Sequence, residues 1–178
     1  MRLFIAALLP DEIKVRMDGY IGALKSRCGG VKWEQRKKLH VTLKFLGSVE
    51  DSKVPGVFSI INELVRNYSP FETEITCFGG FPDMRYPRIL YIGLSENPKL
   101  SSLQGRVDEA LAPLGFPRET RRFLPHVTIG RVKSRIRIIE PFPIPEKYKF
   151  TIDEIAVVKS DTRRDGSVYT PLHIFCLR

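Results

Sequence analysis

The feature that most constrains this chain is a short sequence, His-Val-Thr, that occurs twice. The first copy spans residues 40–42 and the second spans residues 126–128, so that the second copy begins 86 residues after the first. Half of the 178-residue chain is 89 residues. A motif that returns at almost half the chain length predicts an internal duplication, in which each half supplies one such segment.

Both copies are predicted to be β-strands. Successive side chains of a strand point to opposite faces, so that His40 shares a face with Thr42, and His126 shares a face with Thr128. The apolar residues between and after them are expected to face a core. These predicted core residues are Val41, Leu43 and Phe45 in the first copy, and Val127 and Ile129 in the second.

Two strands of this kind on opposite walls of a cleft would bring two imidazoles and two hydroxyls to one small group. A single histidine in a strand is usually structural, but two in identical tripeptides favour acid and base catalysis. The chain holds three histidines, and His173, which no threonine follows two positions later, is interpreted as structural. Two histidines without an HExxH or similar cluster are too few for a zinc site, so neither a metal nor a cofactor is predicted.

The charge of the chain favours an anionic partner. The formal net charge is +9, and clustered lysines and arginines bind phosphates; an ordinary solvated surface is the alternative interpretation. Basic segments precede both histidine strands, at residues 36–38 and 116–124.

The cysteines and the apolar runs indicate the cellular compartment of the protein. The three cysteines are widely spaced, which indicates neither a disulfide framework nor a zinc motif and fits a reducing compartment. The short apolar start, ended by Pro10, is interpreted as a buried strand, and no run is long enough to cross a membrane. We expect a soluble, cytoplasmic protein.

Helices and strands alternate along the rest of the chain. Apolar spacing predicts helices from Pro10 to about Cys28, at 54–67 and at 100–114, the last ending at Gly115. Further strands are predicted at 2–9, 31–34, 71–78, 88–94, 148–152, 155–159 and 168–177. In the strand at 71–78, the predicted buried side is Phe71, Thr73, Ile75 and Cys77, with Gly79-Gly80 as a closing turn. The proline-rich residues 141–145 are expected to be irregular, and Asp165-Gly166 to form a hairpin turn.

The motifs resemble those of the 2H phosphoesterases, a superfamily named for two His-x-Thr motifs. The resemblance covers the whole chain and is strongest to the RNA 2′,3′-cyclic phosphodiesterases, formerly called 2′-5′ RNA ligases. It is carried by the opening residues 2–6, by residues 39–47 around the first motif and by residues 125–131 around the second. It implies an α+β, bilobal fold, with two pseudo-symmetric antiparallel sheets facing a central cleft and helices outside. Residues 1–178 would then be one domain of two interleaved lobes with one motif in each.

The resemblance also implies roles for single residues. Thr42 and Thr128 would hydrogen-bond the cyclic phosphate, and Arg131 would bind it too. Regular strand alternation would point Arg131 away from His126, but Gly130 tolerates a bulge that re-aims the next side chain. Lys44, in phase with His40 in a regular strand, is a second candidate for phosphate contact, or else a charge at the rim.

The implied reaction is hydrolysis of a terminal 2′,3′-cyclic phosphate to a 2′-phosphate, without metal. By resemblance His40 is the proton donor and His126 the proton acceptor, roles that suit imidazole because its usual pKa is about 6.5. Expected substrates are RNA ends or small cyclic nucleotides, with no membrane partner, and we expect a monomer. Two alternatives are 2′-5′ ligation in the same site and a non-catalytic RNA-binding module, in which Trp33, Tyr86 and Phe123 would stack on bases.

Overall fold

The computed structural model describes residues 1–134, 147–163 and 166–178. Its α-helices are α1 (Asp11–Lys25), α2 (Val54–Val65) and α3 (Pro98–Leu111), and its short 3-10 helices are η1 (Arg36–Lys38), η2 (Asp51–Lys53) and η3 (Ala112–Leu114). The strands are β1 (Arg2–Leu8), β2 (Val31–Trp33), β3 (His40–Ser48), β4 (Phe71–Phe81), β5 (Ile89–Leu94), β6 (His126–Val132), β7 (Lys149–Ile152), β8 (Glu154–Arg163) and β9 (Gly166–Cys176).

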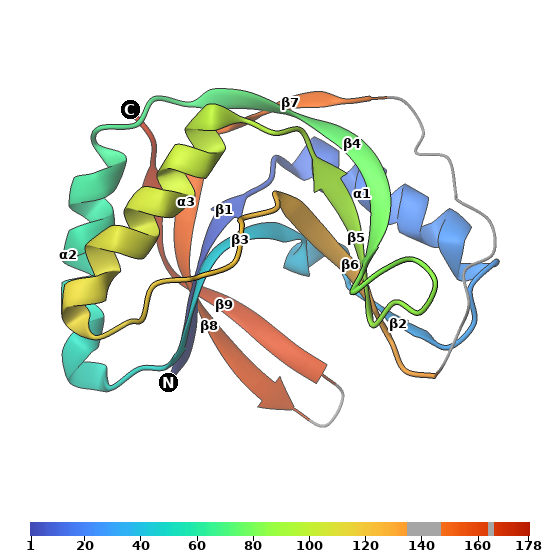
Figure 1. Ribbon diagram of the computed structural model, residues 1–178, viewed down its shortest axis with the longest axis horizontal. Helices are drawn as coiled ribbons and strands as arrows, with labels where there is room; N and C mark the ends of the chain where they lie inside the picture. The colour runs from blue at the N-terminus through green and yellow to red at the C-terminus, as the bar shows by residue number, and fades with distance from the viewer. Residues whose placement is uncertain (135–146, 164–165) are drawn as a thin grey trace.

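The strands form two antiparallel halves. The β1 half consists of β3, β1, β8 and β9, and the β5 half consists of β7, β4, β5 and β6, with β2 paired to β6. The two halves meet where Val41 of β3 pairs with Val127 of β6, so that hydrogen bonding runs through a single sheet. The predicted α+β architecture, with two antiparallel halves and helices outside, is confirmed, although the halves are joined edge to edge (Figure 1).

The helices α1 and α3 each pack on the half of the sheet that does not contain the strand before them. The helix α1 follows β1 in sequence but packs on the β5 half, where Tyr20 lies 6.2 Å from Phe78 (ring centroids) and the Arg16 guanidinium lies 3.8 Å from the Tyr148 ring centroid. The helix α3 follows β5 but packs against β3, beside α2 (Figure 1). Each half is therefore covered by a helix that follows a strand of the other.

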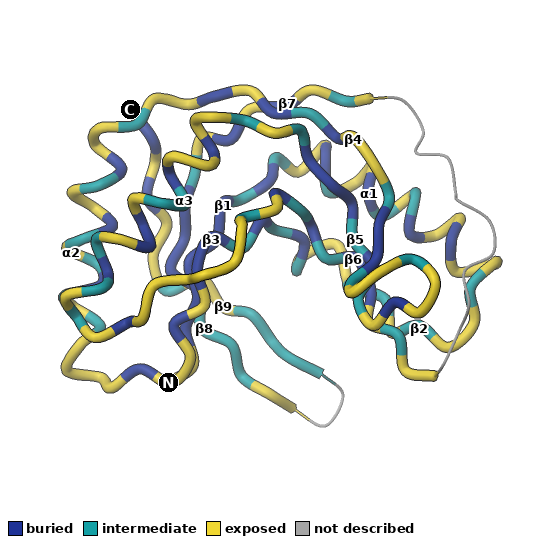
Figure 2. Tube along the Cα trace, viewed as in Figure 1, coloured by how far each residue is buried: buried dark blue, intermediate teal, exposed yellow. Residues whose placement is uncertain are grey.

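Alternation along β1 divides the apolar residues between two layers. Leu3, Ile5 and Ala7 belong to the main core under the helices, whereas Phe4 and Ala6 face the other side of the sheet. There they form a small cluster with Ala156 and Val158, bordered by Leu8 and Tyr169. The buried centre of the sheet contrasts with the projecting end of the β8–β9 hairpin, which is exposed or partly exposed (Figure 2).

Two predictions for β4 are wrong. The predicted turn at Gly79-Gly80 lies inside the strand, which continues to Phe81. These glycines allow close packing rather than a turn, because a Cβ on Gly79 would lie 2.3 Å from Cζ of Tyr91. Cys77, predicted on the buried side, is exposed, because a bulge at Thr76 shifts the alternation.

The other predicted elements are present with shifted ends. The strand β8 continues to Arg163, and Gly115, with φ of 88°, follows η3 in the left-handed conformation that glycine favours. The strands β8 and β9 pair as an antiparallel hairpin, as predicted, but Asp165 of the predicted turn and the proline-rich residues 141–145 lie outside the described residues. Among the residues that are described, no helix is long and apolar enough to cross a membrane.

Candidate active site

The two His-Val-Thr copies lie side by side where the halves meet. The strands β3 and β6 are antiparallel, and the middle residues of the two motifs, Val41 and Val127, are directly paired. This register places His40 next to Thr128 and Thr42 next to His126, because antiparallel neighbours run in opposite directions. All four polar side chains stand on the face of the sheet opposite the two buried valines.

Both motif strands contain a bulge at the residue after the threonine. In β3, Thr42 pairs with Ala6 and Lys44 with the adjacent Ile5, which leaves Leu43 as the extra residue. In β6, Thr128 pairs with Tyr91 and Gly130 with the adjacent Leu90, which leaves Ile129 as the extra residue. The two bulges are 86 residues apart, like the motifs themselves, so the internal repeat extends to backbone irregularities.

The bulge in β3 overturns two predictions. Phe45, expected in the core, is 73% exposed, and Lys44, expected beside His40, is only 6% exposed. The Lys44 ammonium forms a buried ion pair with Asp108 of α3 and donates a hydrogen bond to the carbonyl of Pro117 at 2.8 Å. Lys44 is therefore neither a phosphate ligand nor a rim charge.

The equivalent bulge in β6 turns Arg131 toward the histidines. The Nε of Arg131 lies 3.7 Å from the carboxylate of Glu34, and Arg131 also interacts with the Tyr169 hydroxyl, whose pKa it lowers against the larger effect of burial. The Tyr169 ring in turn meets the ring of His40 edge-on at 5.5 Å. The side chains of Arg131 and His40 are thus linked through one residue of β9.

The two histidines are held in the same way. Nδ1 of His40 donates to the carbonyl of Lys38 at 2.6 Å, and Nδ1 of His126 donates to the carbonyl of Leu124 at 2.7 Å. In each case the acceptor lies two residues before the histidine. A proton fixed on Nδ1 leaves Nε2 of the neutral ring as the basic nitrogen. The Nε2 of His40 accepts a hydrogen bond from the Thr42 hydroxyl at 3.1 Å.

Aromatic side chains surround both imidazoles. Phe4 stacks on His40 at 4.8 Å between ring centroids, while Phe81 and Tyr91 meet His126 edge-on at 5.1 and 5.4 Å. Together with Tyr169, these aromatics are site residues that were not predicted from the sequence. In the sequence, each of them is only an aromatic residue in or near a strand. The sequence does not indicate which strands pair and therefore which aromatic rings reach the histidines.

Burial lowers the pKa of both histidines. The pKa of His40 falls to about 4, mainly because burial penalises the imidazolium, although the hydrogen bond to Lys38 opposes the shift and the nearby His126 adds to it. Burial also lowers the pKa of His126, against the effect of its bond to Leu124. Both rings are therefore neutral in the free protein at pH 7, and a bound anion would raise both pKa values.

The other histidine and the predicted stacking residues lie elsewhere. His173 contacts Phe58 of α2, with 5.8 Å between ring centroids, on the opposite face of the sheet. Trp33 and Phe123 pack against the main core, whereas Tyr86 is 42% exposed. In the described ranges, no three His, Cys, Asp or Glu side chains lie together as a metal site.

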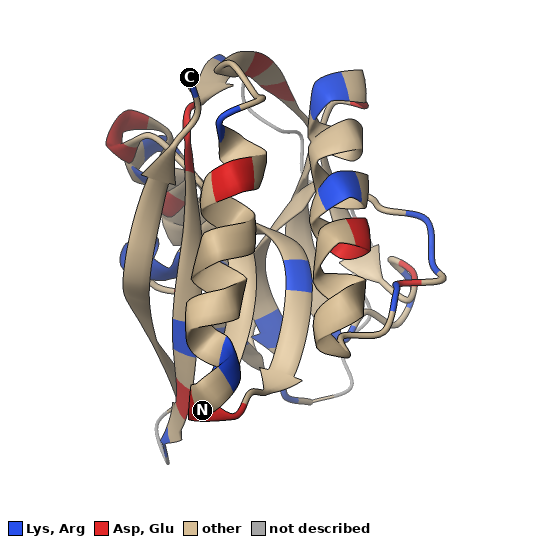
Figure 3. Ribbon diagram, turned by 90° about the vertical axis from the view of Figure 1, so that its left-hand side faces the viewer, with Lys and Arg blue, Asp and Glu red and all other residues tan. Residues whose placement is uncertain are grey.

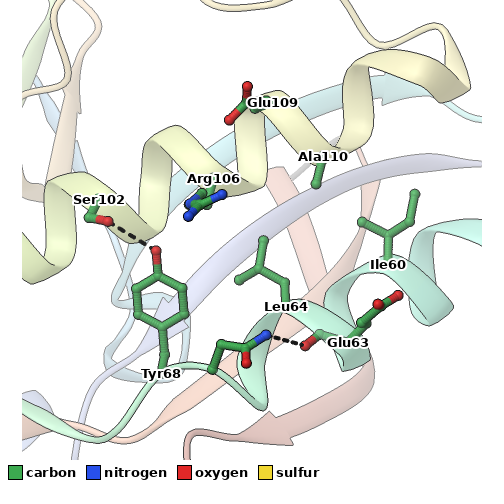
Figure 4. A pocket seen from close by; sticks show the side chains of 9 residues that line it. Ile60, Glu63, Leu64, Tyr68, Ser102, Arg106, Glu109 and Ala110 are labelled. Atoms are coloured by element: carbon green, nitrogen blue, oxygen red, sulfur yellow. Dashed lines mark hydrogen bonds between the residues drawn. The ribbon is translucent and has the colours of Figure 1, made fainter.

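A cavity of about 510 Å³ lies between α2 and α3 (Figure 4). It is lined by Ile60, Glu63, Leu64, Asn67, Tyr68, Ser102, Arg106, Glu109 and Ala110. The Tyr68 hydroxyl hydrogen-bonds Ser102 at 3.0 Å. The cavity contains no histidine and none of the predicted site residues, so the candidate active site remains the face that carries the two motifs.

Comparison with known proteins gives consistent matches. The family model described as the 2′-5′ RNA ligase superfamily matches residues 9–164. Two proteins named RNA 2′,3′-cyclic phosphodiesterase are similar over almost their whole length. The one from Methanothermobacter thermautotrophicus is 30% identical, with 99% of each chain covered, and the one from Methanocaldococcus jannaschii is 33% identical, with 95% of this chain and 96% of the relative covered.

Solved structures agree with these matches. A crystal structure of a Thermus thermophilus protein superposes with a TM-score of 0.91 at 27% identity, covering 100% of this chain and 98% of that one. The crystal structure of E. coli LigT complexed with 3′-AMP superposes with a TM-score of 0.83 at 25% identity, covering 99% of this chain and 97% of LigT.

Proposed function

The chain belongs to the 2′-5′ RNA ligase superfamily, and we propose that it is an RNA 2′,3′-cyclic phosphodiesterase, as the relatives that it matches are named. The observation that carries the proposal is the pairing of Val41 with Val127, which brings both His-Val-Thr motifs to one face of the sheet. The reaction is hydrolysis of a terminal 2′,3′-cyclic phosphate to a 2′-phosphate, by two histidines and without metal.

In the proposed mechanism, His126 acts as the base. Its neutral Nε2 takes a proton from a water molecule as the water oxygen attacks phosphorus. His40 acts as the acid and gives a proton from Nε2 to the departing 3′ oxygen, so that the bond between phosphorus and the 3′ oxygen breaks and the 2′ bond remains. The pair exchanges its protonation states in one turnover and is reset by proton exchange with water.

Because the pKa of His40 is low, its ring becomes protonated, and thus able to donate a proton, when substrate binds. In the free protein burial keeps the ring neutral, but the negative charge of a bound cyclic phosphate favours the imidazolium. Once protonated, Nε2 no longer accepts from the Thr42 hydroxyl, which is 3.1 Å away. That hydroxyl is then free to donate to a phosphate oxygen, so substrate binding and acid activation support each other.

Thr42, Thr128 and Arg131 are the proposed phosphate ligands. Their hydroxyl and guanidinium donors would stabilise the charge that develops on the non-bridging oxygens. Arg131 is held by Glu34 and Tyr169 beside His40, which supports this role. Arg131 thereby offers a fixed positive charge in a site whose histidines start neutral.

The proposed substrates are RNA ends that carry a 2′,3′-cyclic phosphate, and small cyclic nucleotides. We further propose that residues 1–178 act as one domain of two interleaved lobes, because the helices α1 and α3 each cover the half to which their preceding strand does not belong. A monomeric state and a cytoplasmic location also belong to the proposal; the location is supported by free, widely spaced cysteines.

The test is hydrolysis in excess EDTA of a short RNA that ends in a 2′,3′-cyclic phosphate, followed by phosphorus NMR. The parent should yield a 2′-phosphate. His40→Ala and His126→Ala should each lower kcat by roughly 10²–10⁴-fold, the usual contribution of a positioned acid or base.

The matched control is His173→Ala, which removes an imidazole from the opposite face of the sheet. It should retain the parent rate. A 3′-phosphate product, or rates within about threefold of the parent in either motif variant, would refute the proposed roles, since loss of an acid or base costs about a hundredfold or more.

A further inference from the structure

In the proposed reaction the cyclic phosphate lies on the last nucleotide of the RNA, so the rest of the strand must leave the active site along one side. A basic segment adjoins each histidine. The helix η1 ends at Lys38, whose carbonyl holds His40, and the segment 116–124 ends at Leu124, whose carbonyl holds His126. The near-symmetric fold thus offers two possible paths for the outgoing RNA strand. They differ in whether their cations are paired with carboxylates.

Two of the three arginines in the segment 116–124, Arg118 and Arg122, are compensated by carboxylates, whereas the exposed Arg121 forms no ion pair with the residues that the structure describes. The Nε of Arg118 lies 3.8 Å from Asp108, and Arg122 forms an ion pair with Glu96. Asp108 also accepts two hydrogen bonds from the backbone N–H of Glu119, each at 3.1 Å. Phosphates approaching this segment would have to displace the existing carboxylate partners of Arg118 and Arg122.

The cations of η1 have no such partners. Among the described residues, none of Arg36, Lys37 and Lys38 forms an ion pair. Arg36 and Lys37 are exposed, and the ammonium of Lys38 lies 5.9 Å from the ring centroid of Tyr169, the residue that contacts His40. Three successive cations therefore run from solvent to the edge of the catalytic site.

The outer face of the β1 half offers no comparable track. Of the helices that cover it, α2 carries a single charged residue, Glu63, and α3 carries acidic and basic side chains together (Figure 3). Phosphate binding by single-stranded RNA depends on a continuous run of cations that can replace counterions. Within the described part of the chain, η1 meets this condition next to a catalytic histidine.

We propose that the RNA strand preceding the terminal nucleotide leaves the active site across η1, with its backbone phosphates bound by Arg36, Lys37 and Lys38. This inference rests on the proposed function and adds the path of the substrate to it. The helix η1 would then increase the affinity for RNA. It would not affect the binding of a cyclic mononucleotide, which has no upstream phosphates.

The test compares two substrates, 2′,3′-cyclic AMP and an RNA hexanucleotide with a 2′,3′-cyclic phosphate end, and two double variants. Arg36→Ala/Lys37→Ala removes two cations from η1, and Arg121→Ala/Arg122→Ala removes two from the other segment as a matched control. The η1 variant should raise KM for the hexanucleotide by about tenfold, and lower the salt slope of log KM by about 1.4, as two lost phosphate contacts predict for single strands.

The remaining kinetic parameters should stay near the parent values. For both variants the kcat values and the KM for cyclic AMP should remain within about twofold, because neither variant alters a group that contacts the reacting phosphate. The control variant should also keep its KM for the hexanucleotide. An increase in the control variant alone would place the exit at 116–124, and no increase in either would mean that RNA is not held beyond its last nucleotide; both results overturn the proposal.

Failure of the proposed function would look different. In that case the parent would convert neither substrate, and affinity for a fluorescent hexanucleotide would be measured by anisotropy. Weaker binding by the η1 variant alone would then support the RNA path while the enzymatic role is abandoned. Equal binding by all three proteins would overturn the path.

Discussion

At the scale of residues, the site depends on histidines whose tautomer is set by the backbone. Each Nδ1 proton is engaged by a carbonyl two residues earlier, at Lys38 or Leu124. Both rings can therefore exchange protons with substrate only through Nε2. The repeated His-Val-Thr motif identified His40 and His126 as a pair from the sequence, whereas their aromatic neighbours depend on which strands pair and could not be identified in this way.

The depressed pKa of His40 predicts a pH dependence of stability. In the unfolded chain the ring titrates near its usual value of about 6.5, and in the folded protein near 4. Between these values the unfolded state binds a proton that the folded state does not. The free energy of unfolding therefore carries no penalty from His40 above about pH 6.5, and it falls by about 1–3 kcal/mol as pH falls toward 4, once the partial exposure of His40 in the structure is allowed for.

Urea unfolding at pH 7 and pH 4.5 measures this loss. Carboxylates titrate in the same range, so the useful quantity is the difference between proteins. His40→Gln should lose less unfolding free energy on acidification than the parent, by about 1–2 kcal/mol. His173→Gln controls for replacing an imidazole with an amide. An equal loss in the parent and His40→Gln would show that the pKa of His40 is not depressed in the folded protein.

At the scale of elements, the bulges decide which side chains reach the site. Regular alternation correctly placed His40 with Thr42 and His126 with Thr128, because these pairs precede the bulges. It failed at Lys44 and Phe45, since the extra residue Leu43 depends on pairing with β1, a partner that the local sequence does not specify. The glycine at 130 did suggest a bulge in the second copy, and the bulge lies one residue earlier, at Ile129.

Gly130 also permits β2 to approach β6 closely. A Cβ at this position would lie 2.8 Å from Cγ1 of Val31 and 3.1 Å from Cε3 of Trp33. Gly130→Ala should therefore lower the free energy of unfolding by about 1–3 kcal/mol, the usual cost of overpacking. Because Arg131 follows directly, KM for the cyclic phosphate should rise as well.

Gly105→Ala is the matched control for this substitution. Gly105 lies within α3, and a Cβ there would meet no atom within 4 Å. Alanine should raise the unfolding free energy by about 0.5–1 kcal/mol, since glycine is unfavourable inside a helix. Equal stability of the two variants in urea would contradict the packing argument.

At the scale of the whole molecule, long-range contacts tie the two halves together. Lys44 of β3, Asp108 of α3 and the segment that leads to His126 share one buried network. The repeated motif predicted two halves, and helical spacing predicted three helices, because both are local properties. The exchange of α1 and α3 between the halves was not predictable in this way, since it depends on which apolar faces meet in three dimensions.

Removing one partner of the buried pair should be costly. Asp108→Ala leaves the Lys44 ammonium buried beside alanine, so the unfolding free energy should fall by about 3–5 kcal/mol. Arg118→Ala removes an exposed partner of the same carboxylate and should cost under about 1 kcal/mol. Denaturant unfolding of both variants at pH 7 measures the difference.

A third variant separates loss of charge pairing from loss of packing. Lys44→Met/Asp108→Leu replaces both charges with apolar side chains, and should recover most of the stability lost in Asp108→Ala, because no charge is left unpaired. If the double variant is as unstable as Asp108→Ala, the pair acts through the hydrogen bonds to residues 117 and 119 instead.

The pairing of Val41 with Val127 has a consequence for the roles of the two histidines. A local two-fold axis through this pair relates the two motifs, so the backbone treats both histidines alike and cannot itself assign donor and acceptor. A difference between the proposed donor and acceptor must therefore come from unmatched side chains, such as Tyr169 and Phe4 beside one ring and Tyr91 beside the other. Replacement of those neighbours would change the relative proton affinities of the two rings while leaving the scaffold intact.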